Sequence, residues 1–453
     1  MEQRTALVIG GGIGGLTAAV ALDRRGWAVT VLERAAGPDP GSASGHPADG
    51  GGTPRRNGAG IGLAPNAQRA LDTLEIGDAV RALAARQATG ELRLPGGRRL
   101  ARTDDAAAVR RFGGPVLVVH RAELTGTLAG RLPEGMVRTG VTASLVDPGD
   151  PRPGGRPARV RVVEAGGGET RGDGAGGDGA GGGGETGRCV GRELTADLVV
   201  AADGIHSGVR RAVFPGQPEP RYAGFTAWRF VVPAPAGPCT AHETWGPGGL
   251  WGTVPLRDGR IYAYATAAVP PGGRAVDDER AELRRRFGSW HPPVPALLAA
   301  VEPAAVLRND VYTAAAPPPA FHRGRVALLG DAVHPMTPNL GQGGCQTIED
   351  AVVLAHEAGP DADLTAALAA YTRQRLPRTS AVVRRAERIG RLTTWRSRPA
   401  RALRAALMVV PARLAPDLAV RALDGIADWY PPAPAYPARG RDTRPAAHPK
   451  EHQ

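Results

Sequence analysis

The chain begins with an apolar run that ends in a group of glycines. Residues 5–9, Thr-Ala-Leu-Val-Ile, carry no charge, which is typical of a buried parallel strand. A predicted helix follows over residues 14–25, and residues 27–32 form a second strand-like run. This order of strand, glycine-rich turn, helix and strand predicts a parallel α/β sheet.

Two later apolar runs end at acidic turns. Residues 198–204 end in Asp-Gly, and residues 326–331 end in Gly-Asp. The second turn is followed by a Pro- and Gly-rich loop and then by a predicted helix over residues 346–357. Both runs are therefore expected to be buried strands that end at an acidic turn.

Between these two runs the pattern changes to short aromatic and β-branched stretches separated by Pro and Gly. The stretches predict an antiparallel sheet and cover residues 225–232, 242–245, 250–255 and 260–267. Arg229 lies inside the first stretch, where an unpaired buried charge would be costly. It must therefore be paired, exposed at an edge or engaged with an anionic substrate.

Three segments lack a globular pattern. Residues 37–57 and 166–187 are glycine-rich and predict flexible loops, and the Pro- and Arg-rich residues 431–453 predict a disordered tail. Strand patterns at residues 158–163 and 193–201 flank the second loop. We therefore expect that loop to be an enlarged hairpin connection.

The glycines of the first turn have the Gly-x-Gly-x-x-Gly spacing of a phosphate cradle. Gly10 permits the tight turn, Gly12 lets the backbone approach a pyrophosphate, and Gly15 lets the helix pack on the strand. Glu33 follows about twenty residues later, where a carboxylate accepts ribose hydroxyls and disfavours a 2′-phosphate. The segment predicts dinucleotide binding, and its combination with the distant Gly-Asp turn indicates FAD.

These patterns predict an α/β fold in which a Rossmann-like FAD/NAD(P)-binding domain is interleaved with an antiparallel-sheet domain and followed by C-terminal helices. The expected nucleotide-binding parts are residues 1–215 and 311–395. The antiparallel sheet is expected over residues 216–310, and the C-terminal helices over residues 396–430.

Composition and charge exclude several other functions. The 453 residues carry a formal net charge of +12, but Lys450 is the only lysine and the arginines are spread along the chain without a recognition motif. We therefore expect no nucleic-acid partner. Cys189, Cys239 and Cys345 are too few and too widely spaced for a disulfide framework or a metal site, which favours the cytoplasm. Neither a signal peptide nor a membrane-spanning stretch is expected.

Taken together, the motifs resemble the group A flavoprotein monooxygenases, the aromatic hydroxylases typified by para-hydroxybenzoate hydroxylase. The resemblance covers roughly residues 4–395 and is strongest to salicylate- and urate-hydroxylase-like members. It implies that the antiparallel sheet forms the substrate domain. It rests on the glycine cradle, on the Asp-Gly turn at residues 203–204, and on the Gly-Asp turn with the later segment 338–344.

The resemblance implies a role for each matched residue at the nucleotide end of FAD. Residues expected at the pyrophosphate are Gly10, Gly12, Gly14 and Gly15. Those expected at the adenosine end are Glu33 and Arg34. Asp203 would serve both FAD and the nicotinamide nucleotide, and Arg121 would reach the ribityl-phosphate region.

The resemblance likewise implies roles at the flavin end. Gly62, in the segment 58–66, would pass near the flavin, and Asp331 would bind the ribityl hydroxyls. A second group would lie at the flavin pyrimidine edge, where N–H donors stabilise the anionic reduced form. Its members are Gly341, Gln342, Gly343, Gly344 and Cys345.

The reaction implied by the resemblance is hydroxylation. NADH or NADPH would reduce FAD, O₂ would add to flavin C4a, and the hydroperoxide would hydroxylate a small aromatic or electron-rich cyclic substrate. The expected partners are that substrate, O₂ and NAD(P)H, for a monomer or homodimer. Candidate catalytic residues are Arg229, as an anion binder, and His334, as an acid or base near pH 7, although its family position is usually structural.

Two other functions stay open on the sequence alone. One is an FAD-dependent epoxidase or reductase on the same fold, acting on an isoprenoid or polyketide-like substrate. NAD(P)H oxidation without oxygen insertion would identify the reductase. The other is a binding or scaffold protein with a vestigial flavin, which a flavin spectrum in the purified protein would contradict. The sequence contains no evident metal-ligand cluster.

Overall fold

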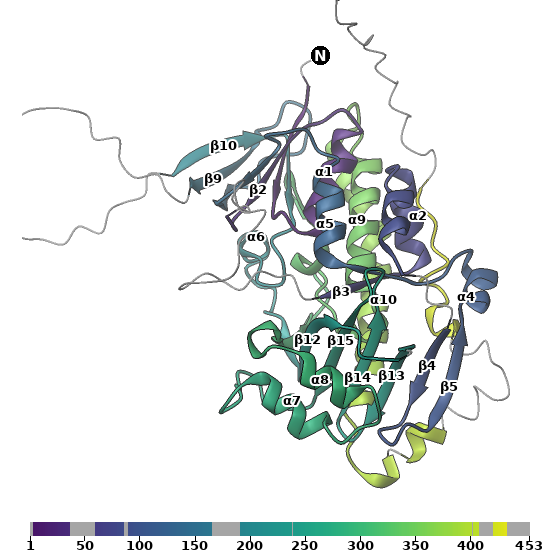
Figure 1. Cartoon of the computed structure of the whole chain (residues 1–453). Coiled ribbons are helices and arrows are strands. Elements are labelled where there is room, and N and C mark those ends of the chain that lie inside the picture. The colour runs from purple at the N-terminus through teal and green to yellow at the C-terminus, as the bar shows by residue number, and fades with distance from the viewer. Residues whose placement is uncertain are drawn as a thin grey trace, which may run out of the picture.

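The computed structural model describes residues 3–36, 59–85, 89–164, 191–237, 239–400, 402–406 and 420–432. The two predicted loops at 37–57 and 166–187, and nearly all of the predicted tail, lie outside these residues. Figure 1 shows two parts, an upper part built on a parallel sheet and a lower part built on a mostly antiparallel sheet with one parallel strand pair. No helix in the described ranges is long and apolar enough to span a membrane.

The upper sheet brings together strands that are far apart in the sequence. Its order is β17-β18-β11-β1-β2-β7, and all neighbours are parallel except β17 and β18. The strands are β1 (Thr5–Ile9), β2 (Ala28–Glu33), β7 (Val137–Thr139), β11 (Leu198–Ala201), β17 (His322–Arg323) and β18 (Val326–Leu328). Because β1, β11 and β18 are parallel neighbours, the three turns that follow them meet at one edge of the sheet. The predicted parallel α/β sheet is confirmed.

Helices pack side by side against this sheet (Figure 1). Helix α1 (Ile13–Asp23) is buried along almost its whole length, and it contacts α9 (Gly343–Glu357) and α5 (Arg121–Ala129). Helix α2 (Pro65–Thr73) also contacts α9, and α3 (Gly77–Leu83) contacts α2. An apolar helix without a polar face is what burial on two sides requires.

The lower sheet has seven strands in the order β16-β12-β15-β14-β13-β4-β5. They are β4 (Thr89–Arg93), β5 (Arg99–Asp104), β12 (Arg221–Pro233), β13 (Ala241–Gly246), β14 (Gly249–Pro255), β15 (Arg260–Ala267) and β16 (Leu307–Thr313). The four predicted strands are its centre. One face packs on α7 (Glu279–Phe287) and α8 (Val294–Ala300) through a core that includes Trp228, Phe230 and Trp251.

The strand predicted over residues 193–201 is two strands in two sheets. Strand β10 (Arg192–Ala196) pairs with β9 (Ala158–Glu164), and β9 pairs with β8 (Val141–Asp147). At Asp197 the chain passes to β11, because the Asp197 carboxylate accepts the Thr5 backbone N–H at 3.0 Å and ties the chain to β1. The pairing of β9 with β10 confirms the predicted hairpin strands.

The remaining elements connect these layers. Strands β3 (Gly60–Leu63) and β6 (Leu117–His120) form a two-stranded ribbon. The other helices are α4 (Asp105–Phe112), α6 (Gly208–Val213) and the long α10 (Leu364–Thr393). Short 3₁₀ turns occur at Pro303–Ala305, Gly330–Ala332, Pro338–Leu340 and Val420–Leu423.

Candidate functional site

Three of the residues after β1 are glycine for three different structural reasons. Gly10 has a φ of +110°, and a Cβ there would lie 2.4 Å from the Ala202 carbonyl oxygen. A Cβ at Gly15 would lie 1.8 Å from the Gly10 oxygen, so only glycine lets α1 approach β1. A Cβ at Gly12 would meet no described atom within 4 Å. Gly12 thus leaves the open approach that a pyrophosphate needs.

Gly14 has a packing reason for being glycine, and its predicted phosphate contact stays a prediction. A Cβ at this position would lie 2.4 Å from the Thr347 methyl group and 2.7 Å from a methyl group of Leu329. Gly14 therefore lets α1 pack closely on α9 and on the end of β18. Close packing of the two helices explains why this residue is a glycine.

Glu33 lies at the end of β2 beside the glycine turn. One carboxylate oxygen accepts the Gly11 backbone N–H at 2.6 Å, and the other accepts that of Ala35 at 2.8 Å. Each oxygen retains a further lone pair for a ribose hydroxyl. Arg34, the next residue, is exposed.

Asp203 follows β11 at the same edge. Its Oδ2 accepts the Val209 backbone N–H at 3.2 Å, whereas its Oδ1 is buried and has no hydrogen-bond partner among the described residues. Buried polar atoms are rarely left without a partner. The free oxygen therefore fits a site that is completed by a ligand hydroxyl.

Asp331 lies in the 3₁₀ turn after β18. Its side chain is exposed, yet desolvation by the surrounding protein raises the pKa of its carboxyl group, against the opposing effects of His334 and Arg121. Arg121, the first residue of α5, also acts electrostatically on Tyr262 of the lower sheet. The charged groups thus link the two parts of the molecule at this edge.

His334 is buried, with 2% of its surface exposed. Its Nε2 lies 2.5 Å from Asp350 Oδ2, and the other Asp350 oxygen accepts Arg375 Nε at 2.7 Å. Burial opposes ionisation of Asp350, but His334 and Arg375 outweigh it and lower its pKa. Asp350 also accepts the backbone N–H of Gly330 at 3.0 Å. His334 is therefore well placed to hold the turn, and its burial gives no support to contact with a substrate.

Asp350 and Arg375 were not among the residues predicted from the sequence. Asp350 and its neighbour Glu349 are fully buried on α9, and Arg375 reaches both from α10. Two adjacent acids directly before the apolar run Ala351–Ala355 were the available signal, because buried carboxylates need partners.

The loop before α9 is held against β3. Gly341 has a φ of +63°, and a Cβ at Gly344 would lie 2.5 Å from an Ile61 methyl group. Gln342 is 1% exposed, and its side-chain oxygen accepts Asn66 Nδ2 at 3.1 Å. A Cβ at Gly62 would meet no described atom within 4 Å, so this backbone is open to a planar group.

Cys345 contributes packing to this loop. It is fully buried, and the Ala64 backbone N–H donates to its sulfur at 3.4 Å. Burial raises the pKa of the thiol to about 12, which keeps it protonated and unreactive near neutral pH. Its neighbours Gly343 and Gly344 begin α9, whose first backbone N–H groups are not used within the helix.

Arg229 lies on the face of the lower sheet that is turned away from α7 and α8. It is half-buried and donates to Asn309 at 3.3 Å. Tyr262 shares its face, and a Cβ at Gly60 of β3 would lie 2.5 Å from the Tyr262 ring. Burial raises the pKa of Tyr262, and Arg229 acts in the opposite direction. Arg229 and Tyr262 thus face the β3 segment.

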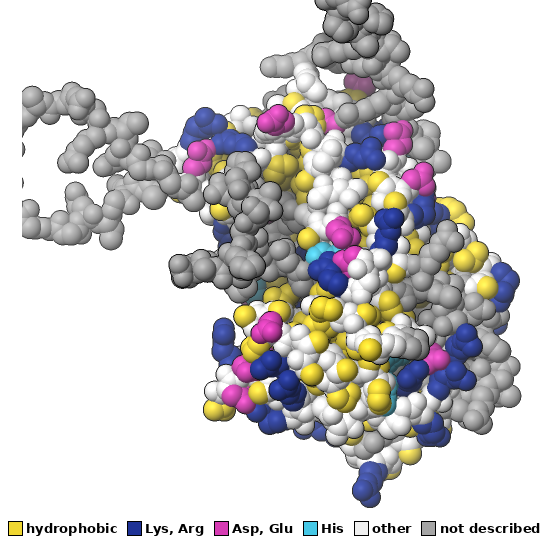
Figure 2. Space-filling view, in the orientation of Figure 1, with side chains coloured by type: hydrophobic (Ala, Val, Ile, Leu, Met, Phe, Trp, Pro, Cys, Tyr) yellow, Lys and Arg dark blue, Asp and Glu magenta, His cyan; other side chains and the backbone are white. Residues whose placement is uncertain are grey.

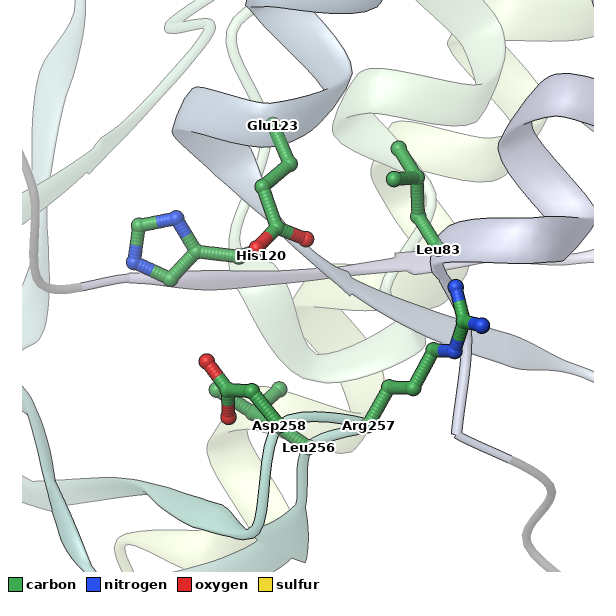
Figure 3. A pocket seen from close by; sticks show the side chains of 6 residues that line it. All are labelled: Leu83, His120, Glu123, Leu256, Arg257 and Asp258. Carbon is green, nitrogen blue, oxygen red and sulfur yellow. The ribbon is translucent and has the colours of Figure 1, made fainter.

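A separate polar pocket of about 270 Å³ lies between the two parts. Figure 2 shows acidic, basic and histidine side chains gathered at the middle of this face. Figure 3 shows the lining side chains, which come from the ends of α3 and β6, the first turn of α5 and the β14–β15 turn: Leu83, His120, Glu123, Leu256, Arg257 and Asp258. None of them is a predicted site residue.

Comparison with known proteins agrees with this geometry. Residues 8–73 match a family described as an NAD(P)-binding Rossmann-like domain, and residues 180–386 match an FAD binding domain. The chain is 37% identical to aurachin C monooxygenase/isomerase of Stigmatella aurantiaca, over 86% of this chain and 90% of that protein. It is 31% identical to an FAD-dependent urate hydroxylase of Klebsiella pneumoniae, over 84% of this chain and 88% of that protein.

A solved structure extends the similarity to the whole fold. The crystal structure of Klebsiella pneumoniae HpxO complexed with FAD and uric acid superposes with a TM-score of 0.73 at 28% identity. The match covers 94% of this chain and 96% of that protein. The glycine turn, the partnerless Asp203 oxygen and the open backbone at Gly62 all fit FAD. The chain therefore belongs to the FAD-dependent aromatic monooxygenases.

Proposed function

We propose that this protein hydroxylates a small, acidic aromatic or enol-type compound, using FAD, O₂ and electrons from NADH or NADPH. The observation that carries the proposal is the position of Arg229 and Tyr262, which face the β3 segment from the lower sheet. An anionic ring bound by Arg229 would lie between the sheet and the flavin. The binding of uric acid by HpxO is consistent with an acidic substrate.

The residues at the edge of the upper sheet would hold the cofactor. Gly12 leaves room for the pyrophosphate, and Asp331 would accept ribityl hydroxyls. A ligand hydroxyl would donate a hydrogen bond to Asp203 Oδ1, which has no partner among the described residues. FAD, when bound, supplies electron transfer from NAD(P)H and the transfer of one oxygen atom to the ring. The start of α9 would favour negative charge near the flavin, because its N–H groups and dipole are positive.

We further propose a cytoplasmic location and a monomer or homodimer. The described cysteines, Cys239 and Cys345, are free, which is consistent with a reducing compartment.

The test is Arg229→Met, which keeps much of the apolar stem and removes the charge. We expect flavin content to stay unchanged and affinity for an acidic phenol to fall by about 1.5–3 kcal/mol, the range for hydrogen bonds to charged groups. Affinity is measured from the change in flavin absorbance on titration. Arg221→Met is the control, because Arg221 lies on the same strand but pairs with Glu387 near the surface. Equal affinities in both variants would remove the support for an anionic substrate.

Oxygen-18 from labelled O₂ in the product separates hydroxylation from the alternatives. A stimulated oxidation of NAD(P)H without label in any product would identify an FAD-dependent reductase. A labelled epoxide of an isoprenoid would identify an epoxidase.

A further inference from the structure

Four residues form one row across the lower sheet. Arg229 of β12 pairs with Tyr264 of β15, Tyr264 with Gly252 of β14, and Gly252 with Glu243 of β13. Side chains of directly opposed residues project from the same face. Arg229 and Glu243 are thus the two charged ends of a row that spans three strand spacings, or about 14 Å between backbones at 4.7–4.9 Å a spacing.

Gly252 allows the middle of the row to be filled by an aromatic ring. A Cβ at Gly252 would lie 2.0 Å from the Tyr264 ring. Because glycine has no side chain, the ring lies across β14, and its hydroxyl donates to Glu243 Oε1 at 3.1 Å. Tyr264 therefore forms an aromatic floor that runs from the Arg229 side to Glu243.

Glu243 has unusual partners for a carboxylate. Besides Tyr264, it accepts only the Trp245 indole N–H, at 2.7 Å, and no Arg, Lys or His within the described ranges forms an ion pair with it. Burial raises its pKa, and the two hydrogen bonds oppose the shift. Glu91 on the adjacent strand is the opposite case: Arg93 and Arg99 bind its carboxylate, and its pKa is lowered despite the cost of burial.

The hydrogen-bonding capacity of Glu243 is not exhausted. A carboxylate offers about four acceptor positions, and each oxygen of Glu243 accepts one neutral donor. In Glu243→Gln the amide oxygen can keep the Trp245 bond, and the amide NH₂ group can donate to the Tyr264 hydroxyl. The side chains of Arg229, Tyr264 and Glu243 are each partly accessible, whereas Trp228 and Trp251 on the opposite face are fully buried. Solvent therefore reaches both charged ends of the row, where a ligand could meet them.

We propose that Glu243 is a specificity-determining residue that binds a hydroxyl or N–H donor of the substrate, at the end opposite the acidic group held by Arg229. The preferred substrate is then a ring system with an acidic group at one end and a hydrogen-bond donor at the other. This inference rests on the proposed function and defines its substrate class more closely.

The test compares 6-hydroxy-2-naphthoate with 2-naphthoate, which differ only in the distal donor. Dissociation constants are measured on the FAD-loaded protein from the change in flavin absorbance. Wild type should prefer the hydroxylated acid, and Glu243→Gln should reduce this preference by about tenfold to a hundredfold, the range for a hydrogen bond to a charged group. Affinity for 2-naphthoate should change less than threefold. Glu91→Gln, the matched control on the other face, should leave both affinities unchanged.

Tyr264→Phe keeps the proposal testable if Glu243→Gln fails to fold. This variant retains the carboxylate and should retain the preference for the hydroxylated acid. Loss of the preference in Tyr264→Phe, or an unchanged preference in Glu243→Gln, would overturn the assignment to Glu243.

A protein that holds FAD and hydroxylates only rings without a distal donor would refute this inference and leave the proposed function intact. A protein whose flavin responds to no aromatic acid would refute the proposed function itself.

Discussion

At the scale of single residues, Asp331 is the most direct test of the cofactor site. Asp331→Ala removes the carboxylate that we propose binds ribityl hydroxyls. We expect FAD affinity to fall by about 1.5–3 kcal/mol for each charged hydrogen bond lost. The turn itself should persist, because the Gly330 N–H is held by Asp350 and not by Asp331. Flavin content after gel filtration measures the effect, and equal flavin in variant and wild type would contradict the role.

The buried His242 should make the free energy of unfolding decrease in acid. It is 5% exposed, and burial lowers its pKa from 6.5 to about 4, although its hydrogen bond to the Thr240 carbonyl opposes the shift. The folded protein therefore favours neutral His242. The stabilisation is complete above pH 6.5 and is lost as the pH falls to about 4, a change of about 3 kcal/mol at 1.36 kcal/mol per pKa unit.

His242→Phe removes this titration, and denaturant midpoints between pH 7 and pH 4 measure the result. The variant should lose less stability over this range than wild type. Some pH dependence of stability should remain in the variant because of the nearby His291. Its ring centroid is 5.2 Å from that of His242, and burial lowers its pKa too. Parallel pH curves for the two proteins would refute the assignment to His242.

The sequence identifies some site residues and not others for a physical reason. The positions of Asp203 and Asp331 at the sheet edge could be predicted, because each lies within three residues of the end of an apolar strand; their roles toward FAD stay predictions. Glu243 and Asp350 could not, because their roles depend on partners from other strands and helices. Arg229 is intermediate: the cost of a charge within an apolar strand was visible, but which face it occupies was not.

At the scale of elements, two glycines in the turn from β1 to α1 have different roles. Gly15 is needed for packing of α1 on β1, and we expect Gly12 to be needed for binding of FAD. Gly15→Ala should reduce both stability and FAD retention, because its Cβ would lie 1.8 Å from the Gly10 oxygen and push α1 from β1. Gly12→Ala should keep the stability of the apoprotein, because the new methyl group meets no described atom within 4 Å, yet it should lose FAD by blocking the pyrophosphate. Thermal melting of both apoproteins and their flavin content measure the difference. Similar melting temperatures for the two variants would contradict the packing argument.

Element identity was easier to predict than pairing. The four central strands of the lower sheet could be predicted from their β-branched and aromatic pattern, but β4 and β5 joined this sheet from more than a hundred residues upstream. Likewise, a continuous strand-like pattern over residues 193–201 concealed the passage from one sheet to another at Asp197. The local pattern predicts that a segment forms a strand, whereas long-range packing determines which sheet the strand joins.

At the scale of the whole molecule, a buried ionic network joins the cofactor turn to the C-terminal part of the chain. Arg375 of α10 pairs with Glu349 and Asp350 of α9, and Asp350 in turn holds the Gly330 N–H. Arg378, one helical turn later, bonds Glu349 and the Ile426 carbonyl oxygen. Glu349, Asp350 and Arg375 are buried, so each charge depends on the others.

Arg375→Met tests this dependence. Removing one partner of a buried ion pair leaves charge uncompensated and typically costs about 3–5 kcal/mol. We expect a loss of that order in the free energy of unfolding, together with weaker FAD retention, because the Gly330 turn loses its fixed acceptor. Denaturant titration and flavin fluorescence in the same samples measure both effects. Arg373→Met is the matched control, since Arg373 lies two residues away on the exposed side of α10. Equal stabilities of the two variants would show that the network does not couple the cofactor turn to the helices.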